Sequence, residues 1–292
     1  MQPENKGLLL GMLGVIAFGL TLPFTRMVVP YMDPIFIGLG RAVVAALVSI
    51  VILTVMRVPR PRGYDWFRLL GVVVGVILGF PVLSAYAMQT VPASHGGVVL
   101  GILPLVTAIA ATIVSGERPS FGFWMVGLLG SGLVVAYSLY QGAGEFGFGD
   151  IALIAAVIAA AFGYAIGGTL SRRLGGWQVI CWALVISLPI ITYPAWMMMP
   201  SMPADIPANA WWAFAYLAIF SQLLGFFFWN QGLAIGGIAR VSQCQLLQPF
   251  VTLLGSAMII GETLDSITIG CAVLVVGVVA ISKRMPVTQR TA

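Results

Sequence analysis

Charged side chains are scarce in this sequence of 292 residues. Asp, Glu, Lys and Arg together make up 8% of the chain, whereas a soluble domain has about 25%. Hydrophobic residues make up 60%, which is more than the core of one soluble domain can bury. Lipid must therefore surround much of the chain, and about ten spans of roughly 20 residues fit into its length.

Side chains for catalysis or metal binding are also few. The sequence has one histidine, and its three cysteines lie in apolar runs without the spacing of metal ligands. It contains no His/Asp/Glu cluster, no activated nucleophile, no Walker A sequence and no dinucleotide-binding fingerprint. We therefore expect no enzyme, no metal site, no cofactor and no direct use of ATP.

Apolar runs fill most of the chain and predict an integral membrane protein. With the N-terminus in the cytoplasm, twelve of the 14 Lys and Arg residues fall in cytoplasmic segments, Arg26 falls outside, and Arg41 falls within a run. This bias supports the orientation, with both termini cytoplasmic, and it explains the net charge of +5 without nucleic-acid binding. The ten runs are 7–28, 34–56, 66–89, 94–115, 120–140, 149–170, 177–199, 209–231, 238–260 and 265–282.

Two stretches at an offset of 145 residues share one pattern. His95–Glu117 and Arg240–Glu262 each begin with a basic residue, have a proline nine positions later, and end in Gly-Glu. An internal repeat fixes the architecture before single residues are interpreted. With five spans per half, the second half enters the membrane inverted. We therefore predict two inverted five-helix repeats, residues 1–144 and 145–292.

The matched positions within these stretches resemble those of the EamA family in the drug/metabolite transporter superfamily. The resemblance covers nearly the whole chain. It implies a central cavity lined by helices 1, 3, 4, 6, 8 and 9 and open alternately to each side of the membrane. The matched residues are Ala93, Pro104 and Glu117 in one stretch and Ala239, Pro249 and Glu262 in the other.

The ninth run has the densest set of polar residues. Gln245, Gln248, Thr252 and Ser256 fall at helical spacing on one face, which predicts a cavity wall that binds a polar group, or else hydrogen bonds between helices. In the fourth run the positions that match the two glutamines are Leu100 and Leu103. This contrast predicts a cavity for an amphipathic solute.

Other candidates for substrate binding come from four further runs. Aromatic rings can cover an apolar group or an ammonium, although lipid-facing positions explain such rings equally well. Prolines and end-of-helix glutamates are interpreted as hinge or structural residues, and the basic residues Arg26, Arg41, His95 and Arg240 as capping or interfacial groups. The further substrate-binding candidates are Tyr86, Gln89, Pro104, Phe162, Tyr164, Trp229 and Asn230, and the hinge or structural set is Pro104, Pro249, Glu117 and Glu262.

The resemblance implies an inner-membrane exporter of small amphipathic metabolites that works by alternating access. Because it extends to exporters of aromatic amino acids and methionine, we expect phenylalanine, tryptophan, tyrosine and methionine as substrates. Drugs or nucleoside-like metabolites are the alternative, and a channel is excluded only weakly. No acidic residue lies deep in a run, so we expect uncoupled or gradient-driven transport. The expected partners are a small-molecule solute and lipid; the sequence leaves the oligomeric state open and is compatible with a monomer.

Overall fold

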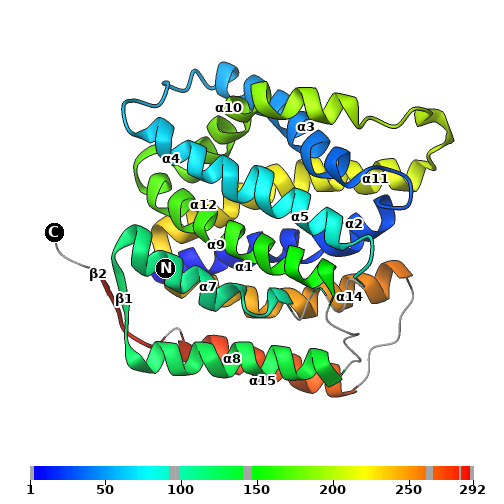
Figure 1. Ribbon diagram of the computed structural model, residues 1–292. Helices are drawn as coiled ribbons and strands as arrows, with labels where there is room; N and C mark the ends of the chain where they lie inside the picture. Colours follow the sequence, from blue (N-terminus) through cyan, green and yellow to red (C-terminus); the bar gives the residue numbers. More distant parts are fainter. Residues whose placement is uncertain are drawn as a thin grey trace.

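The computed structural model describes residues 3–91, 96, 99–140, 147–260, 266–282 and 284–289, and it is a bundle of helices (Figure 1). Residues 3–140 form α1 (Pro3–Gly19), α2 (Thr21–Val28), α3 (Pro34–Val55), α4 (Asp65–Val72), the π-helix η1 (Val73–Gly79), α5 (Phe80–Ala87), α7 (Leu103–Ser115) and α8 (Phe121–Tyr140). Residues 147–282 form α9 (Phe148–Leu174), α10 (Gly176–Met197), the 3-10 turn η2 (Pro203–Asp205), α11 (Ala208–Tyr216), the π-helix η3 (Leu217–Leu224), α12 (Gly225–Gly236), α13 (Ile238–Ser242), the 3-10 helix η4 (Gln243–Leu247), α14 (Gln248–Ile260) and α15 (Ser266–Ser282).

The helices confirm that most of the chain is helical and apolar enough to enter a membrane. Described helices lie in all ten predicted runs. Within the described residues, six are long and apolar enough to span, and three further apolar helices are shorter. Ten spans in an inverted arrangement therefore stay a prediction. The six are Pro3–Val28, Pro34–Val55, Asp65–Ala87, Phe148–Leu174, Gly176–Met197 and Ala208–Gly236.

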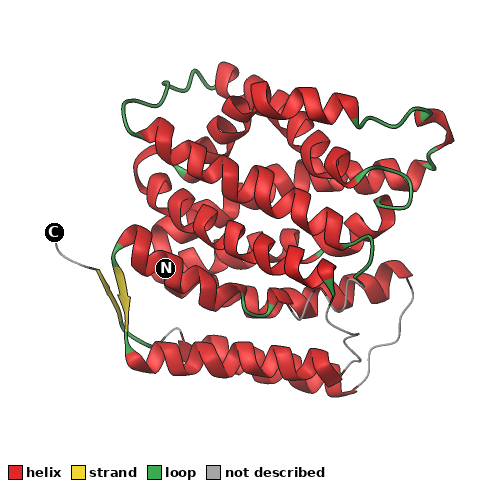
Figure 2. Cartoon of the chain, viewed as in Figure 1, coloured by secondary structure: helices red, strands yellow, loops and turns green. Residues whose placement is uncertain are grey.

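Two short strands depart from the all-helical expectation. Beyond α7, which ends at the left-handed Gly116, β1 (Glu117–Pro119) runs extended and pairs antiparallel with β2 (Val287–Gln289) (Figure 2). Glu117 lies opposite Gln289 in this pair. The C-terminal segment supplies the partner strand for residues that sequence reasoning placed at a helix end.

Prolines decide where several helices break. Pro23 lacks the N–H that would bond the carbonyl of Gly19, and its ring crowds that carbonyl, so α1 ends at Gly19 and α2 starts at Thr21. The Thr252 hydroxyl of α14 donates to the freed Gly19 carbonyl at 2.5 Å. The matched prolines of the repeat also stand at breaks, because α7 begins one residue before Pro104 and α14 one residue before Pro249.

The two π-helices lie at equivalent positions of the sequence. η1 starts at Val73 and η3 at Leu217, an offset of 144 residues, which extends the repeat to a feature that hydropathy does not report. Pro81 follows η1, but Gly225 follows η3, so proline is not their shared cause. Short π segments occur frequently at functional sites.

Helices from the two ends of the sequence pack against one another. α1 lies along α12, α3 along α10, and α5 and α7 against α9, whereas α8 and α15 form a pair at one side of the bundle (Figure 1). Small residues permit the closest approaches: a Cβ added to Gly75 would lie 2.6 Å from the Ala159 carbonyl oxygen and 2.7 Å from Gly163 Cα. Glycine at this contact thus lets the two helices pack closely.

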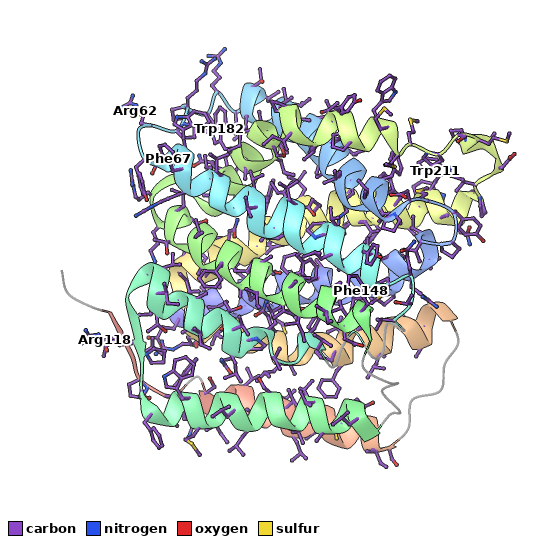
Figure 3. All side chains as sticks on the ribbon, viewed as in Figure 1. Arg62, Phe67, Arg118, Phe148, Trp182 and Trp211 are labelled. Carbon is purple, nitrogen blue, oxygen red and sulfur yellow. The ribbon has the colours of Figure 1, made fainter. Side chains whose placement is uncertain are left out.

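Labelled side chains show which groups lie at each end of the bundle. Arg62 and Arg118 lie at the same end as both chain termini, whereas Trp211 and Phe148 lie toward the opposite end (Figure 3). Two of the predicted cytoplasmic arginines thus lie at one end.

Candidate functional site

A small cavity lies in the middle of the bundle. To a water-sized probe its volume is about 10 Å³, which leaves room for little more than one water molecule. An organic solute enters only if the surrounding helices move apart. Nine elements line the cavity: Phe18 of α1, Thr21 of α2, Arg41 of α3, Val76 of η1, Phe80 of α5, Tyr164 of α9, Ser221 and Gln222 of η3, Phe226 of α12, and Gln248 of α14.

Arg41 is the charged group of this lining. Its side chain is 2% exposed, and its Nε is buried without a hydrogen-bond partner. Among the described residues, it makes neither a hydrogen bond nor an ion pair. Its interpretation as a capping or interfacial group is therefore wrong, because α3 carries it two turns inward on the face toward the cavity. A charge inside a membrane is costly and marks a functional site by default.

Four aromatic rings form one wall. The Phe18 and Tyr164 rings are stacked with centroids 6.3 Å apart, and Phe226 lies 4.9 Å from Phe18. Trp229 completes the group with its ring 5.4 Å from that of Tyr164, and its Nε1 is buried without a hydrogen-bond partner. Phe18, Tyr164 and Phe226 line the cavity and Trp229 packs behind them, so the cavity has an apolar surface with one polar handle, the Tyr164 hydroxyl.

Amides and hydroxyls form the polar part of the lining. Gln222 donates from Nε2 to the Val76 carbonyl at 3.2 Å, joining η3 to η1. The hydroxyls of Thr21 and Ser221 are hydrogen-bonded at 2.8 Å. Gln248 is buried, and its Oε1 has no hydrogen-bond partner. A solute that enters the opened cavity can therefore form hydrogen bonds with these amides and hydroxyls.

The structure brings some of the predicted residues to this cavity. Tyr164 and Gln248 line it, and Trp229 lies one ring contact away. Gln245 is fully buried with both amide atoms unpaired, but η4 changes the helical period there, so it does not continue a regular stripe with Gln248. The Thr252 hydroxyl already hydrogen-bonds the carbonyls of Gly19 and, within its own helix, of Gln248. The side chain of Ser256 lies outside the described residues.

Other predicted binding residues have different surroundings. Tyr86 is 47% exposed and contacts Phe148 edge-on, and Gln89 is exposed. Asn230 donates to the Gly176 carbonyl and thereby ties α12 to α10. The remaining predicted residues lie in packed positions: Leu100 and Leu103 are buried in the main core, Phe162 is half-buried against it, and the Pro104 carbonyl accepts from Ser242. Their part in binding stays a prediction.

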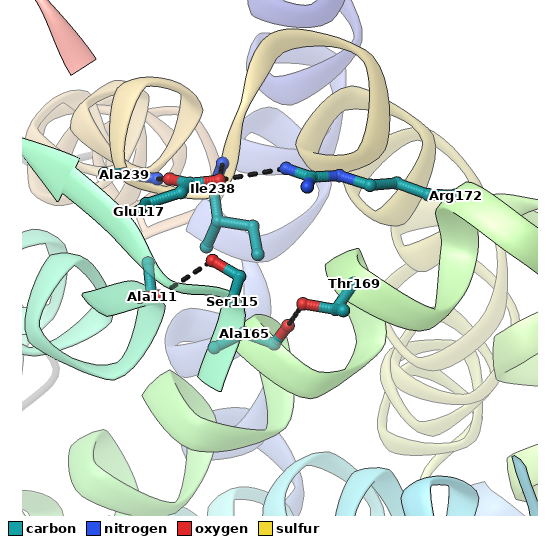
Figure 4. Close-up of polar contacts among 8 residues, drawn as sticks. All are labelled: Ala111, Ser115, Glu117, Ala165, Thr169, Arg172, Ile238 and Ala239. Atoms are coloured by element: carbon teal, nitrogen blue, oxygen red, sulfur yellow. Dashed lines mark hydrogen bonds and ion pairs between the residues drawn. The ribbon is translucent and has the colours of Figure 1, made fainter. Parts of the chain in front are cut away.

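Glu117 is the centre of a polar cluster at the end of the bundle where Arg118 lies. Its Oε1 accepts from the Ile238 amide and from Arg172 Nη2, both at 2.9 Å, and its Oε2 accepts from the Ala239 amide at 2.8 Å (Figure 4). A carboxylate is favourable at a helix N-terminus, here that of α13. Glu117 thus links the end of α7 to the start of α13. The matching Glu262 and the basic His95 lie outside the described residues.

Sequence reasoning missed eight of the ten lining residues: Phe18, Thr21, Arg41, Val76, Phe80, Ser221, Gln222 and Phe226. Arg41 gave the clearest signal, since it is the Lys or Arg that neither side of the membrane accounted for. Ser221 and Gln222 lie in the eighth run, as does Trp229. They were missed because the search for polar residues followed the stripe in the ninth run. Phe18 and Thr21 come from a break in the first helix that spacing alone does not locate. The missing information was the helix geometry around Pro23 and in η3.

Metal and cofactor sites were not expected. Over the part of the chain that the structure describes, no group of three or more His, Cys, Asp or Glu could hold a metal ion.

Known proteins are similar to this chain over most of its length. It is 40% identical over 284 residues to an uncharacterized transporter of Bacillus subtilis, YdeK, covering 97% of this chain and 99% of that one. A second uncharacterized transporter of that organism, YyaM, is 25% identical over 90% of this chain and 89% of its own. A WAT1-related chloroplastic protein of Arabidopsis thaliana is 22% identical over 89% of this chain and 66% of its own.

The fold has also been seen in a crystal structure described only as that of a protein. It superposes with a TM-score of 0.78 at 16% identity, covering 95% of this chain and 98% of that one. The model of the EamA-like transporter family matches twice, at residues 5–138 and at residues 147–283. The two matches and the relatives show that this chain is a multi-pass membrane transporter of small molecules and belongs to the EamA-like transporter family.

Proposed function

We propose that the chain exports small amphipathic metabolites by alternating access, with phenylalanine, tryptophan, tyrosine and methionine as the first substrates to test. One observation carries this proposal: the central cavity combines an aromatic wall with buried amides, hydroxyls and a guanidinium. An apolar side chain fits the wall, and the polar end of an amino acid fits the amides, the hydroxyls and the guanidinium. The resemblance to amino-acid exporters supports the same choice.

Alternating access needs two halves that move against one another. The proposal of ten spans in inverted halves, residues 1–144 and 145–292, is supported by the double match of the family model and by the equivalent π-helices. The cavity takes residues from both halves, so a rotation between them would expose it to each side in turn. Pro104 and Pro249 shape the helices that border this movement.

The proposed location is the inner membrane, with both termini in the cytoplasm. The charge bias of the loops supports this orientation, and so does the common position of Arg62, Arg118 and the chain ends (Figure 3). The protein is proposed to act as a monomer, because the cavity is enclosed by helices of one chain.

Counterflow in proteoliposomes tests the function. Vesicles loaded with unlabelled phenylalanine should accumulate labelled phenylalanine transiently, since a carrier exchanges solute and a channel does not. Tryptophan, tyrosine and methionine should compete, while nucleosides and cationic drugs should not. Counterflow that only nucleosides or drugs support would establish the alternative substrate class.

Two further measurements complete this test. Cells that contain the protein should lose preloaded labelled phenylalanine faster than cells without it, which tests the outward direction. Transport should proceed without stoichiometric proton uptake, because the described residues that line the cavity include no carboxylate. A fixed proton-to-solute ratio in liposomes would contradict uncoupled transport.

A further inference from the structure

Arg41 lies deep in the membrane-spanning part of the chain. α3 starts at Pro34, so Arg41 is seven residues, or about 10 Å, along the helix from its start. The side chain lines the central cavity and does not reach back to the helix end, since it is 2% exposed. A guanidinium at such a place is stable only if another group compensates its charge.

The described part of the chain does not supply that compensation. The cavity lining brings aromatic rings, amides and hydroxyls to Arg41, but no carboxylate. The described carboxylates lie elsewhere: Glu4 pairs with Arg240, Asp65 with Arg173 and Glu117 with Arg172, Asp33 caps α3, Asp150 accepts from the Gly147 amide, and Asp205 lies in the exposed turn η2.

The neighbours of Arg41 suit a planar anion with an apolar tail. A guanidinium presents a fork of N–H donors that matches a carboxylate with two parallel hydrogen bonds. The Gln222 and Gln248 amides lie in the same lining and can donate to further lone pairs. Phe18, Phe80 and Phe226 offer rings to an aromatic or aliphatic tail. Each part of such a solute therefore has a counterpart.

We propose that Arg41 binds the carboxylate of the transported solute, so that the substrates are amphipathic monocarboxylates whose negative charge is required and whose amino group is not. The proposal deepens the proposed function, since it rests on the same cavity. It also narrows it, because neutral drugs and nucleosides lack the group that Arg41 recognises. An ammonium group meets aromatic rings in the described lining and contributes less than the carboxylate.

A binding measurement tests this independently of transport. The thermal unfolding temperature of the purified protein in detergent is measured with 3-phenylpropanoate and with 3-phenylpropanamide, which differ in charge but hardly in shape. A solute that binds the folded protein raises this temperature. We expect the carboxylate to raise it more than the amide, and a series of aliphatic monocarboxylates to show the same preference.

Substitutions then assign the preference to Arg41. Arg41→Gln should weaken carboxylate binding about tenfold or more and abolish the preference over the amide, since hydrogen bonds to charged groups have about this strength. Arg41→Lys keeps the charge without the fork and should fall between. Arg118→Gln removes a charge from the exposed end of the bundle and should behave as the unchanged protein. Without solute, Arg41→Gln should unfold at the same or a higher temperature, which separates lost binding from lost folding.

Each outcome decides between this inference and the exporter proposal. Equal shifts with the carboxylate and the amide, no shift with any monocarboxylate of the series, or an unchanged preference in Arg41→Gln overturns the role of Arg41. If carboxylates bind through Arg41 but phenylalanine shows no counterflow, the inference stands and amino-acid export fails. If phenylalanine counterflow occurs but binding shows no carboxylate preference, amino-acid export stands and the role of Arg41 fails.

Discussion

The cap that Glu117 provides to α13 yields a quantitative prediction. Two buried amides, those of Ile238 and Ala239, donate to this carboxylate, and a buried donor without an acceptor costs roughly 1–3 kcal/mol. Glu117→Ala leaves both amides without an acceptor and should destabilise the protein by roughly 2–6 kcal/mol. Glu117→Gln retains one acceptor oxygen and should cost about 1–3 kcal/mol.

The ion pair with Arg172 should contribute much less than the cap. The Arg172 side chain is 29% exposed, and partly exposed pairs contribute up to about 1 kcal/mol. Arg172→Gln should therefore destabilise less than either change at Glu117. The double variant Glu117→Gln/Arg172→Gln should differ little from Glu117→Gln alone.

Unfolding by denaturant or heat in detergent, followed by tryptophan fluorescence, measures this order. Arg118→Gln is the matched control, because its side chain is exposed in the neighbouring position of β1. If Arg172→Gln destabilises as much as Glu117→Ala, the ion pair and not the helix cap stabilises this end of the bundle, and the reasoning is refuted.

Two other substitutions test α14. Thr252→Val removes the donor to the Gly19 carbonyl and should destabilise the protein by about 1–3 kcal/mol. Thr252→Ser keeps the hydroxyl and should cost less. Equal loss of stability in both variants would show that packing of the threonine methyl group matters instead. Gln248→Leu should abolish phenylalanine counterflow without lowering the unfolding temperature, because its Oε1 has no partner to lose; undiminished counterflow would remove Gln248 from the binding site.

The helical, membrane-spanning character of the chain was predictable because it depends on long-range averages of the sequence. Hydropathy located the runs in which the helices lie, and the offset between Pro104 and Pro249 located the breaks that begin α7 and α14. A run of twenty apolar residues in lipid has few alternatives to a helix, so composition alone restricts it.

The binding cavity was only partly predictable because it depends on local departures from the α-helix. Tyr164, Trp229 and Gln248 were found from residue type and position, but Gln245 was placed on a regular helix that η4 interrupts. Arg41 could not be distinguished from an interfacial arginine, since burial depends on which helices pack around it. The amide partners of Glu117 lie more than a hundred residues away in sequence and follow from the fold alone.

The hydrogen bond between Gln222 and Val76 has a consequence for how the halves could move. Under the 144-residue offset, Gln222 corresponds to Leu78 and Val76 to Phe220, so each partner lies within two positions of the other's equivalent. In the proposed inverted repeat, groups that contact near their own symmetry mates lie close to the axis that would relate the halves. A rotation that exchanges the two orientations of such a carrier leaves points near its axis almost still. This bond should therefore act as a pivot that persists throughout the cycle, and a covalent cross-link between η1 and η3 at this level should leave counterflow intact.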